Sequence, residues 1–234
     1  MKKVVILQSN YIPWKGYFDL LNDADVFIFY DDVQYTKNDW RNRNKIMTQG
    51  GPRWLTIPTG IDANRLVCEV ALNDPGWQAK HWETIRQNYM RAPHFKFYRP
   101  FFEEIYRGTE WRTLSELNHH LIKHIARDLL GSTTEFDDSR RYQLSGQRLE
   151  RLLDLVGQSG ATQYISGPAA KSYIDEAEFA RIGVDLVWKD YSGYPEYPQG
   201  QLPFEHGVSI LDVLFNVGPA ASDVIWGWRQ PRQD

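Results

Sequence analysis

The chain has little of three things: cysteine, long hydrophobic runs and net charge. Its single cysteine, Cys68, excludes an intrachain disulfide framework and predicts a reducing compartment. Its start has two lysines and then only four consecutive apolar residues, too few for the apolar core of a signal peptide or for a transmembrane helix. A formal net charge of −3 gives no overall attraction to nucleic acid or to an anionic membrane. We therefore expect a cytoplasmic protein without a membrane span.

Aromatic residues, in contrast, are plentiful. The 234 residues include nine Trp, thirteen Tyr and eleven Phe, and 42% of all residues are apolar, which is enough for a sizeable core. Such rings either fill the core or line a pocket for a sugar or a nucleobase. The length suits a single domain, which we expect to span residues 1–234.

The hydrophobic pattern alternates between strands and helices. Short β-branched runs predict buried strands at residues 2–8, 25–32, 133–140, 161–167 and 184–191. Helical periodicity is found at residues 17–24, 76–93, 99–131, 146–160, 168–183 and 208–218. Two further strands, 53–60 and 65–72, are expected to form a hairpin. This pattern predicts an α/β fold: a mostly parallel, Rossmann-like sheet with helices on both faces, and a helical insert around residues 76–130.

The loop after the first strand, "QSNYIPWKGYF", is the first candidate site. Ligands of parallel α/β sheets bind at the carboxyl ends of the strands, and the following helix N-terminus offers free N–H groups. We therefore expect Gln8, Asn10, Trp14 and Gly16 to contact a substrate. The alternative is a β–α turn shaped only by its proline and glycine. The loop is also similar to that of the adenylyltransferase superfamily, but Trp14 and Tyr17 stand where its signature histidines would be.

The segment after the second strand, "YDDVQYTKNDWRNRN", is the second candidate. With Lys45, which follows directly, it carries four cations against Asp39 beyond the strand, and it is rich in amides. Adjacent strand residues point to opposite faces, so at most one of the two aspartates faces the crevice directly. Arginine forks bind phosphate or carboxylate, and a nearby carboxylate can take a proton from an attacking amine. The substrate-binding residues expected here are Asp31, Gln34, Arg41, Asn42 and Arg43, with Asp32 as the catalytic base.

Two further motifs carry polar candidates. In "SELNHHLIKH", His120 and His124 have the spacing of a helical metal pair, but no HExxH or cysteine cluster accompanies them, so we expect no metal site. Asn118 and His119 are the better candidates for hydrogen bonding at a site, with His119 as a catalytic group. In "YISGPAAKSYI", a strand is followed by Ser166 and Gly167 and then by a helix opened by proline.

That second motif also contains Lys171, which falls in the predicted first turn of the helix. A cation is disfavoured there unless an anion is bound, so we expect Ser166, Gly167 and Lys171 to bind substrate. A polar stripe, "HGVSILDVLFNVG", offers Ser209, Asp212 and Asn216 on an otherwise apolar helix. It either supports the site or ties down the Tyr/Pro-rich loop around residues 191–206.

Five segments together resemble one family. They are "QSNYIPWKGYFDLL", "ADVFIFYDDVQYTKNDWRNRNKI", "QNYMRAPHF", "YISGPAAKSYID" and "SILDVLFNVGP", and they look like the WbqC-like protein family nearly from end to end. That family usually has Gln-Pro-Asn where this chain has Gln8-Ser9-Asn10, a difference that changes the stiffness of the loop. Its members typically occur in bacterial gene clusters for surface polysaccharides, often beside enzymes that make amino-deoxy sugars. The resemblance therefore implies work on an activated sugar or on its acyl modification.

These observations lead to three functional hypotheses. The first is a transferase that acylates or aminoacylates an amino group of a nucleotide-activated sugar in O-antigen biosynthesis, with no cofactor. Its donor would be a small molecule, a carrier protein or a tRNA, and a homo-oligomer is compatible with the sequence. The second is nucleotidyl transfer or adenylate formation on an adenylyltransferase-like fold. The third is a non-catalytic protein that binds sugar nucleotides. All three depend on the convergence of Asn10, Asp32, Arg43 and Ser166 in one cavity.

Overall fold

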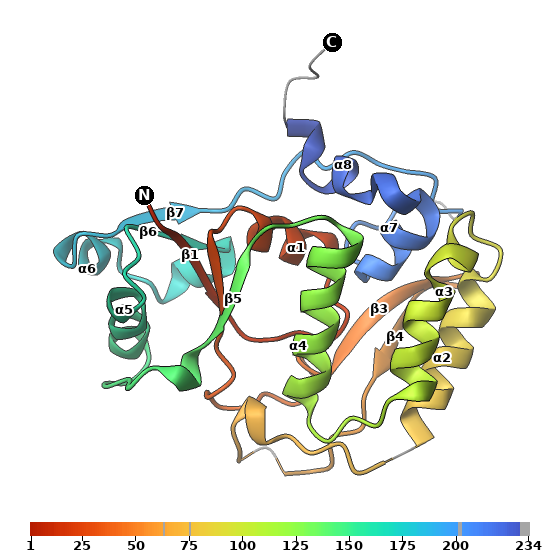
Figure 1. Ribbon diagram of the computed structural model, residues 1–234, viewed down its shortest axis with the longest axis horizontal. Coiled ribbons are helices and arrows are strands. Elements are labelled where there is room, and N and C mark those ends of the chain that lie inside the picture. The colour runs from red at the N-terminus through yellow and green to blue at the C-terminus, as the bar shows by residue number, and fades with distance from the viewer. Residues whose placement is uncertain (63, 75, 201–202, 230–234) are drawn as a thin grey trace.

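Five strands form one parallel sheet in the computed structural model, which describes residues 1–62, 64–74, 76–200 and 203–229 (Figure 1). The strands lie in the order β5, β2, β1, β6, β7, and each neighbouring pair runs parallel. Their bounds are β1 (Lys3–Leu7), β2 (Val26–Phe29), β5 (Glu135–Asp138), β6 (Gln163–Ser166) and β7 (Asp185–Trp188). All five fall inside the predicted strands. The α/β class with a mostly parallel sheet is therefore confirmed, while its Rossmann-like character stays a prediction.

Alternate residues of the strands face two separate cores, because side chains of a strand point to opposite faces in turn. Val5 and Phe27 pack into one core and Val4 and Ile28 into the other. The first core also takes residues from α1 (Lys15–Asn22) and α4 (Leu114–His124), and the second takes residues from α5 (Leu149–Gln158) and α6 (Glu176–Arg181). Both faces of the sheet thus carry helices.

The strand order reverses at β1, since the chain goes from β1 to β2 on one side and later returns to β6 on the other. The carboxyl ends of β1 and β6 therefore form the switch point at which ligands of such sheets usually bind.

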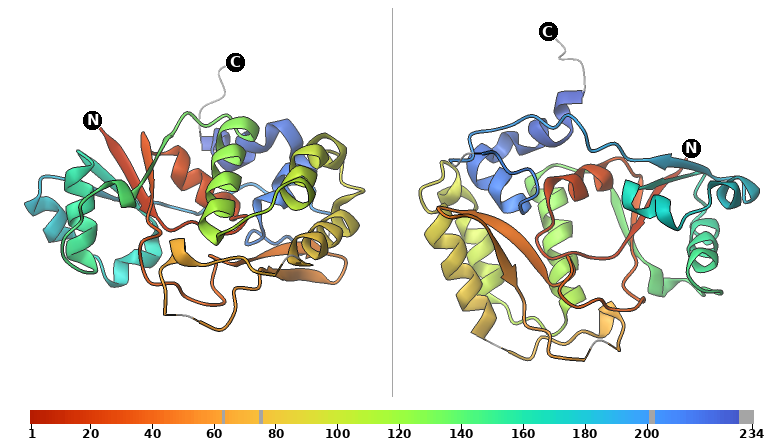
Figure 2. Two further views of the ribbon diagram at one scale, coloured as in Figure 1. Left: turned by 60° about the horizontal axis from the view of Figure 1, so that its bottom comes forward. Right: turned by 180° about the vertical axis from the view of Figure 1, so that it is seen from behind.

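The long connection from β2 to β5 contains a hairpin and three helices (Figure 2). The hairpin pairs β3 (Arg43–Thr48) with β4 (Gly51–Thr56), and the helices are α2 (Gly76–Tyr89), α3 (Phe95–Glu103) and α4. Residues 99–131, where one or two helices were expected, contain the end of α3 and the whole of α4, each followed by a π turn. Leu114, Leu117 and Leu121 are buried, so this side of α4 packs inward.

The predicted hairpin between residues 53–60 and 65–72 is wrong. The strand β4 pairs instead with β3, in a register that puts Lys45 opposite Trp54. The strand β3 was not predicted from the polar segment after β2. Its buried positions include asparagine and isoleucine, and its outer positions include two cations. Residues 65–72 contain only a 3₁₀ turn (Val67–Glu69), and the N–H of Cys68 donates to the carbonyl of Asp31, at 2.9 Å.

The predicted helix at residues 168–183 is also divided. Pro168 begins only a short 3₁₀ helix (Pro168–Ser172). The helix α6 begins after Asp175, whose side chain caps it by accepting a hydrogen bond from the N–H of Ala177. A short polar capping residue offers the backbone an alternative to a continuous helix.

The polar stripe of α7 (Ile210–Val217) ties down the long loop, which confirms the second of its two expected roles. The carboxylate of Asp212 is fully buried and accepts hydrogen bonds from Tyr197 Oη and Gln199 Nε2, both at 2.8 Å. Residues 201–202 of this loop lie outside the described residues. The last helix, α8 (Ala221–Ile225), follows α7. Among the described residues, no helix is long and apolar enough to cross a membrane.

Candidate functional site

Asp31 stands at the centre of the densest polar cluster beyond the carboxyl end of β2. Its side chain has no exposed surface. It accepts hydrogen bonds from the N–H of Ser9 (2.8 Å), Ser9 Oγ (2.7 Å), Ser115 Oγ (2.6 Å) and His119 Nε2 (2.8 Å). These donors come from the end of β1 and from α4, so the carboxylate joins two distant parts of the chain. We therefore assign Asp31 to positioning and not to direct contact with substrate.

The charge of Asp31 is stabilised despite its burial. Burial by itself raises the pKa of a carboxyl group, but the hydrogen bonds from His119, Ser115 and Ser9 outweigh it, so the pKa of Asp31 lies below its usual value. Asp31 is thus a carboxylate at neutral pH and can only accept hydrogen bonds. It follows that Nε2 of His119 carries a proton.

His119 is held in one orientation by two contacts. Its ring stacks on Phe29 with a centroid distance of 3.7 Å, and its Nε2 is bound to Asp31. Its Nδ1 has no hydrogen bond to any described residue, and 12% of the side chain is exposed. A neutral imidazole oriented in this way presents a lone pair at Nδ1 toward the surface.

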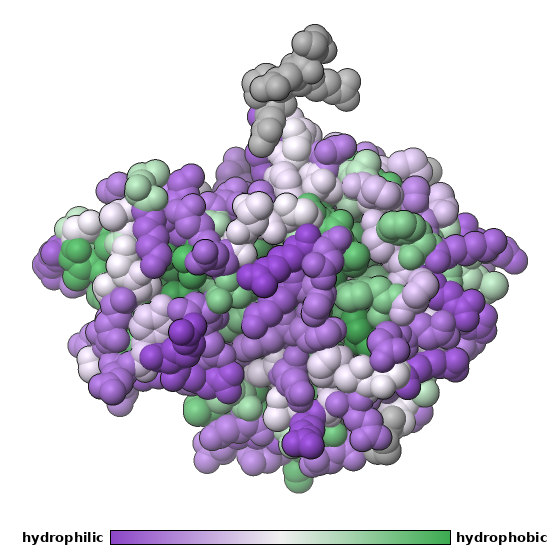
Figure 3. Space-filling model, in the orientation of Figure 1, coloured by the Kyte–Doolittle hydropathy of each residue, from purple (hydrophilic) through white to green (hydrophobic). Residues whose placement is uncertain are grey.

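The exposed part of His119 lines a hollow of about 580 Å³ beside α4. Lys123 and Arg140 also line it, and Arg140 makes a two-pronged ion pair with Asp138, at 2.9 and 2.6 Å. Figure 3 shows hydrophilic residues over α4 on this side of the molecule. An oriented imidazole next to cations suits an anionic substrate with a group to deprotonate.

Asp31 and Asp32 lie beyond β2, which ends at Phe29 and not at the aspartates as predicted. Asp32 points toward α5, on the other side from α4. It accepts a hydrogen bond from Ser139 Oγ and makes an ion pair with Arg151 Nη2, at 2.5 Å. Both carboxylate oxygens of Asp32 are thus already engaged by donors. Its role as a base stays a prediction, and the geometry favours His119 for that role.

Gln8 and Arg41 meet at the carboxyl end of β1. Gln8 Oε1 accepts from Arg41 Nη2, and Arg41 Nη1 is paired with Asp39. Arg41 Nε is buried without a partner among the described residues. Asn10, which follows Gln8 and Ser9 in the loop, is half-buried and makes no hydrogen bond with its side chain among the described residues. Substrate binding by these residues stays a prediction.

Trp14 packs directly against Gly16 within the loop. The ring of Trp14 lies against Tyr191 at a centroid distance of 5.2 Å, and a Cβ at Gly16 would meet ring atoms of Trp14 at 2.3 Å. Gly16 is therefore required by this packing, whether or not a substrate approaches it. The hydroxyl of buried Tyr17 donates to the carbonyl of Gln8 at 3.1 Å, so the loop's aromatic rings face inward.

Replacing Gly16 with alanine should lower the free energy of unfolding by about 2 kcal/mol, since the new methyl group forces the Trp14 ring out of its place. Urea unfolding measures the change. Gly157→Ala is the matched control, because a Cβ at that helical glycine meets nothing within 4 Å and should be neutral or stabilising. Equal stability of Gly16→Ala and wild type would show that the ring moves freely.

Two asparagines that were predicted to bind substrate make hydrogen bonds within the fold. Asn42 Nδ2 donates to the carbonyl of Ile57, at 2.9 Å, and its Oδ1 is buried without a partner in the described part of the chain. Asn118 is fully buried, and its Nδ2 donates to the carbonyl of Arg41, at 2.9 Å, and to Ser9 Oγ, at 3.4 Å. Asn118 thus connects the segment around Arg41 to the cluster around Asp31.

The remaining predicted residues lie apart from that cluster. Ser166 is buried at the end of β6, and a Cβ at Gly167 would meet Tyr191 Oη at 3.4 Å. Lys171 is exposed, and its Nζ lies over the ring of Trp188 at 5.4 Å. Gln34 is exposed beyond β2, where it pairs with Leu66 in an isolated bridge.

Arg43 stacks on Trp54 in the hairpin, with its Cζ 4.3 Å from the ring centroid. Within the described ranges, no contact joins Arg43, Asp32 and Ser166, and each has partners of its own. Their convergence in one cavity therefore stays a prediction.

Metal binding finds no support in the described residues, which contain no group of three or more potential metal ligands. The rings of His120 and His124 lie 4.2 Å apart, but His124 Nδ1 is hydrogen-bonded to Asp128, at 2.6 Å.

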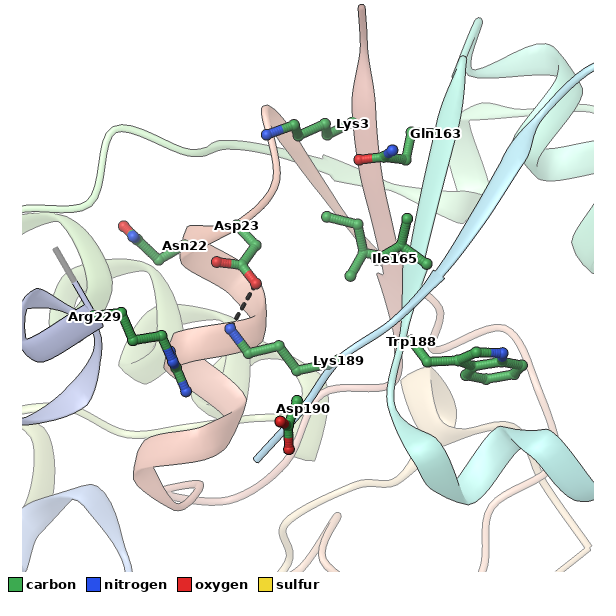
Figure 4. A pocket seen from close by; sticks show the side chains of 10 residues that line it. Lys3, Asn22, Asp23, Gln163, Ile165, Trp188, Lys189, Asp190 and Arg229 are labelled. Carbon is green, nitrogen blue, oxygen red and sulfur yellow. Dashed lines mark hydrogen bonds and ion pairs between the residues drawn. The ribbon is translucent and has the colours of Figure 1, made fainter. Parts of the chain in front are cut away.

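A second hollow, of about 480 Å³, lies between α1 and the ends of β6 and β7 (Figure 4). Lys189 reaches from the end of β7 to Asp23, at 2.5 Å, and to Asp19, at 2.9 Å. Arg229 also binds Asp19, at 2.7 Å. Lys189 and Arg229, two of the cations that line this hollow, are thus already paired with carboxylates.

Sequence reasoning missed two of the serines that build the cluster. Ser9 is the residue at which the loop differs from the usual Gln-Pro-Asn, and its N–H and Oγ both bind Asp31. A proline there could not donate from its nitrogen. Ser115 lies one helical turn before His119, which places both side chains on the face of α4 toward Asp31. That spacing was the available signal.

The fold and the cluster together define an α/β protein with a buried carboxylate that orients a surface histidine. The family model of the WbqC-like protein family matches residues 8–224, and the chain belongs to that family. It is also 44% identical over 232 residues to an uncharacterized protein of Mycobacterium tuberculosis, Rv1507c, in a match that covers 98% of this chain and 100% of that protein. No solved structure matches the chain.

Proposed function

We propose that the protein is a transferase of bacterial surface polysaccharide biosynthesis. It transfers an acyl or aminoacyl group to the amino group of a nucleotide-activated sugar. The observation that carries this proposal is the Asp31/His119 pair, in which Asp31 binds the Nε2 proton of the imidazole and leaves Nδ1 available as a base. The chain belongs to the WbqC-like protein family, and the resemblance to that family implies the polysaccharide context. The cations beside His119 suit the negative charge of a sugar nucleotide.

The proposed step needs one proton acceptor. The amine nitrogen of the sugar attacks the carbonyl carbon of the donor, and Nδ1 of His119 takes the proton that the nitrogen loses. The new bond joins carbon and nitrogen, the bond between that carbon and the donor's oxygen or sulfur breaks, and the leaving group receives the proton from His119. Asp31 stabilises the imidazolium that exists between the two transfers.

Nucleotidyl transfer is less well supported. The positions at which the adenylyltransferase signature would have histidines hold Trp14, packed on Gly16 and Tyr191, and Tyr17, which is buried. Neither side chain can stabilise a phosphate as an imidazolium does. ATP–pyrophosphate exchange should therefore be absent.

The test is a screen of the purified protein with nucleotide-activated amino sugars and with acyl-carrier, acyl-thioester and aminoacyl-tRNA donors. The readout is the mass of the sugar nucleotide. His119→Ala should lower kcat about 100-fold. His94→Ala, at the start of α3, is the control for loss of a histidine. Turnover that is unchanged in His119→Ala would exclude this base, and binding without turnover in any donor mixture would favour the non-catalytic alternative.

The role of Arg140 in the hollow can be tested against a closely matched control, Arg99. Arg140 and Arg99 have side chains 51% and 52% exposed, and each makes a two-pronged pair with a carboxylate. We expect Arg140→Ala to raise KM about tenfold through loss of an anion contact, and Arg99→Ala to leave it unchanged. Equal KM values for the two variants would remove Arg140 from the site.

A further inference from the structure

Two tryptophans and two cations form an exposed patch on the hairpin. We call Trp40, Arg43, Lys45 and Trp54 the tryptophan platform. Trp40 and Trp54 are 43% and 38% exposed, and their ring centroids are 5.3 Å apart. The hairpin lies in front in the right-hand view of Figure 2, on the side turned away from the viewer in Figure 1. Burial in the core therefore does not explain these rings.

The cations of the platform are arranged around one ring. Arg43 Cζ lies 4.3 Å and Lys45 Nζ 5.3 Å from the centroid of Trp54. Neither cation has an ion pair with a described residue, and residues 40–61 contain four cations and no carboxylate. The positive charge of this patch is thus not neutralised, although the whole chain has a formal net charge of −3.

Unsatisfied buried atoms gather at the same segment. Six side-chain atoms are buried without a partner in the described part of the chain, and four belong to Arg41, Asn42, Arg43 and Asn118. Buried polar atoms normally have partners, and these four lie where the segment around Arg41 meets α4. Arg43 Nε is one of these atoms and also belongs to the platform.

We propose that the tryptophan platform binds a nucleoside diphosphate, on the side of the molecule turned away from the hollow beside His119. The base stacks on the indole rings, and Arg43 and Lys45 contact the phosphates. A neutral sugar would explain the tryptophans but not the free cations. A long nucleic acid would need more positive charge than this patch provides on a chain of negative net charge. A nucleoside diphosphate has one ring system to stack and two phosphates to neutralise.

This inference rests on the proposed function for the identity of the ligand class, and the segment at residues 41–43 connects the two sites. The carbonyl of Arg41 accepts from Asn118, which precedes His119, and two residues further along the chain Arg43 enters the platform. One short segment therefore contacts both the helix that holds the base and the surface that holds the nucleotide.

The experiment is calorimetric titration of the full chain with UDP, ADP, GDP, CDP and dTDP, and separately with uridine, pyrophosphate and a single-stranded oligonucleotide. We expect at least one nucleoside diphosphate to bind more tightly than uridine or pyrophosphate. Trp54→Ala should weaken that binding about tenfold through the lost stacking, and Lys45→Ala should weaken it by several fold. Thermal unfolding of each variant checks that it is folded.

The matched control is Trp228→Ala. Trp228 is also 38% exposed and also carries an arginine on its ring, Arg229 at 4.6 Å, but that arginine is paired with Asp19. Its loss should leave nucleotide binding unchanged. Binding that is insensitive to Trp54→Ala, tighter binding of the oligonucleotide, or no nucleotide binding would each overturn the platform. If the platform binds a nucleotide but the protein transfers no group in the donor screen, only the proposed function is overturned.

Discussion

Asp31→Ala should lower the free energy of unfolding by about 4 kcal/mol, the largest effect expected for a single substitution. The substitution leaves the N–H and Oγ of Ser9 and the Oγ of Ser115 without their acceptor at a position with no solvent access. Each buried donor without a partner costs about 1–3 kcal/mol. Urea unfolding monitored by circular dichroism measures the loss, provided that the slope of the transition is unchanged.

The chain offers a closely matched control for burial. Asp154 also accepts from the N–H and Oγ of one serine, Ser145, at 2.7 and 2.9 Å, and from a third donor, Gln158 Nε2, at 2.9 Å. The donors of Asp154 lie at the surface, where water can replace the lost acceptor. Asp154→Ala should therefore cost less than about 1 kcal/mol. Similar losses in the two variants would show that hydrogen-bond count, and not burial, determines the stability contributed by Asp31.

The same cluster links stability to pH. The pKa of Asp31 is lowered in the folded protein, so its contribution is present above the unfolded pKa and is lost as the pH falls through the folded pKa. At neutral pH the carboxylate thus both holds β1 to α4 and fixes the proton on His119 Nε2. The orientation of the proposed base and the stability of the sheet edge depend on one side chain.

The sequence predicted the sheet better than the site. The apolar runs of β1 and β2 can be found from period and composition, whereas β5, with the sequence Glu-Phe-Asp-Asp, carries little apolar pattern. The directions of Asp31 and Asp32 do not follow from strand geometry, because β2 ends at Phe29. The hairpin partner did not follow, because β3 begins with Arg43, Asn44 and Lys45 and has only two apolar residues, Ile46 and Met47.

The composition of the site required tertiary information. Ser9 and Ser115 are 106 residues apart in the chain and meet only because α4 packs on the face of the sheet beside β2. Ser9 has no periodic signal, and the only local signal for Ser115 is its spacing from His119 on α4. Trp40 and Trp54 likewise come together through the hairpin register, which was predicted wrongly.

Acid should destabilise the protein through His81, a residue outside both proposed sites. The ring of His81 is buried between Tyr11 Oη, which donates to Nδ1 at 2.9 Å, and the carbonyl of Thr56, which accepts from Nε2 at 3.2 Å. Burial lowers the pKa of His81 from 6.5 to about 4, because an imidazolium loses its hydration there, and the hydrogen bond to Thr56 opposes this only in part.

The sign of the effect follows from proton binding. Between about pH 6.5 and pH 4 the unfolded chain binds a proton at His81 and the folded protein does not, so stability is complete above the unfolded pKa and falls as the pH approaches the folded pKa. The loss from pH 7 to pH 4.5 should be about 2 kcal/mol. Asp212 acts in the opposite sense, since burial raises its pKa and its contribution therefore grows as the pH falls.

Comparing the pH dependence of stability in His81→Gln and in the wild type separates the effect of His81 from that of Asp212. His81→Gln can keep both hydrogen bonds without titrating, so its loss of stability between pH 7 and pH 4.5 should be about 2 kcal/mol smaller than that of the wild type. His124→Gln, at a side chain that is 44% exposed, is the comparison for the loss of a surface histidine. Urea titrations at five pH values provide the comparison. Parallel losses of stability in His81→Gln and in the wild type would mean that the imidazole of His81 binds a proton inside the folded protein. Nδ1 of His81 would then have to donate to Tyr11, and the hydrogen bonds from Tyr106 through Tyr11 to His81 would reverse their direction.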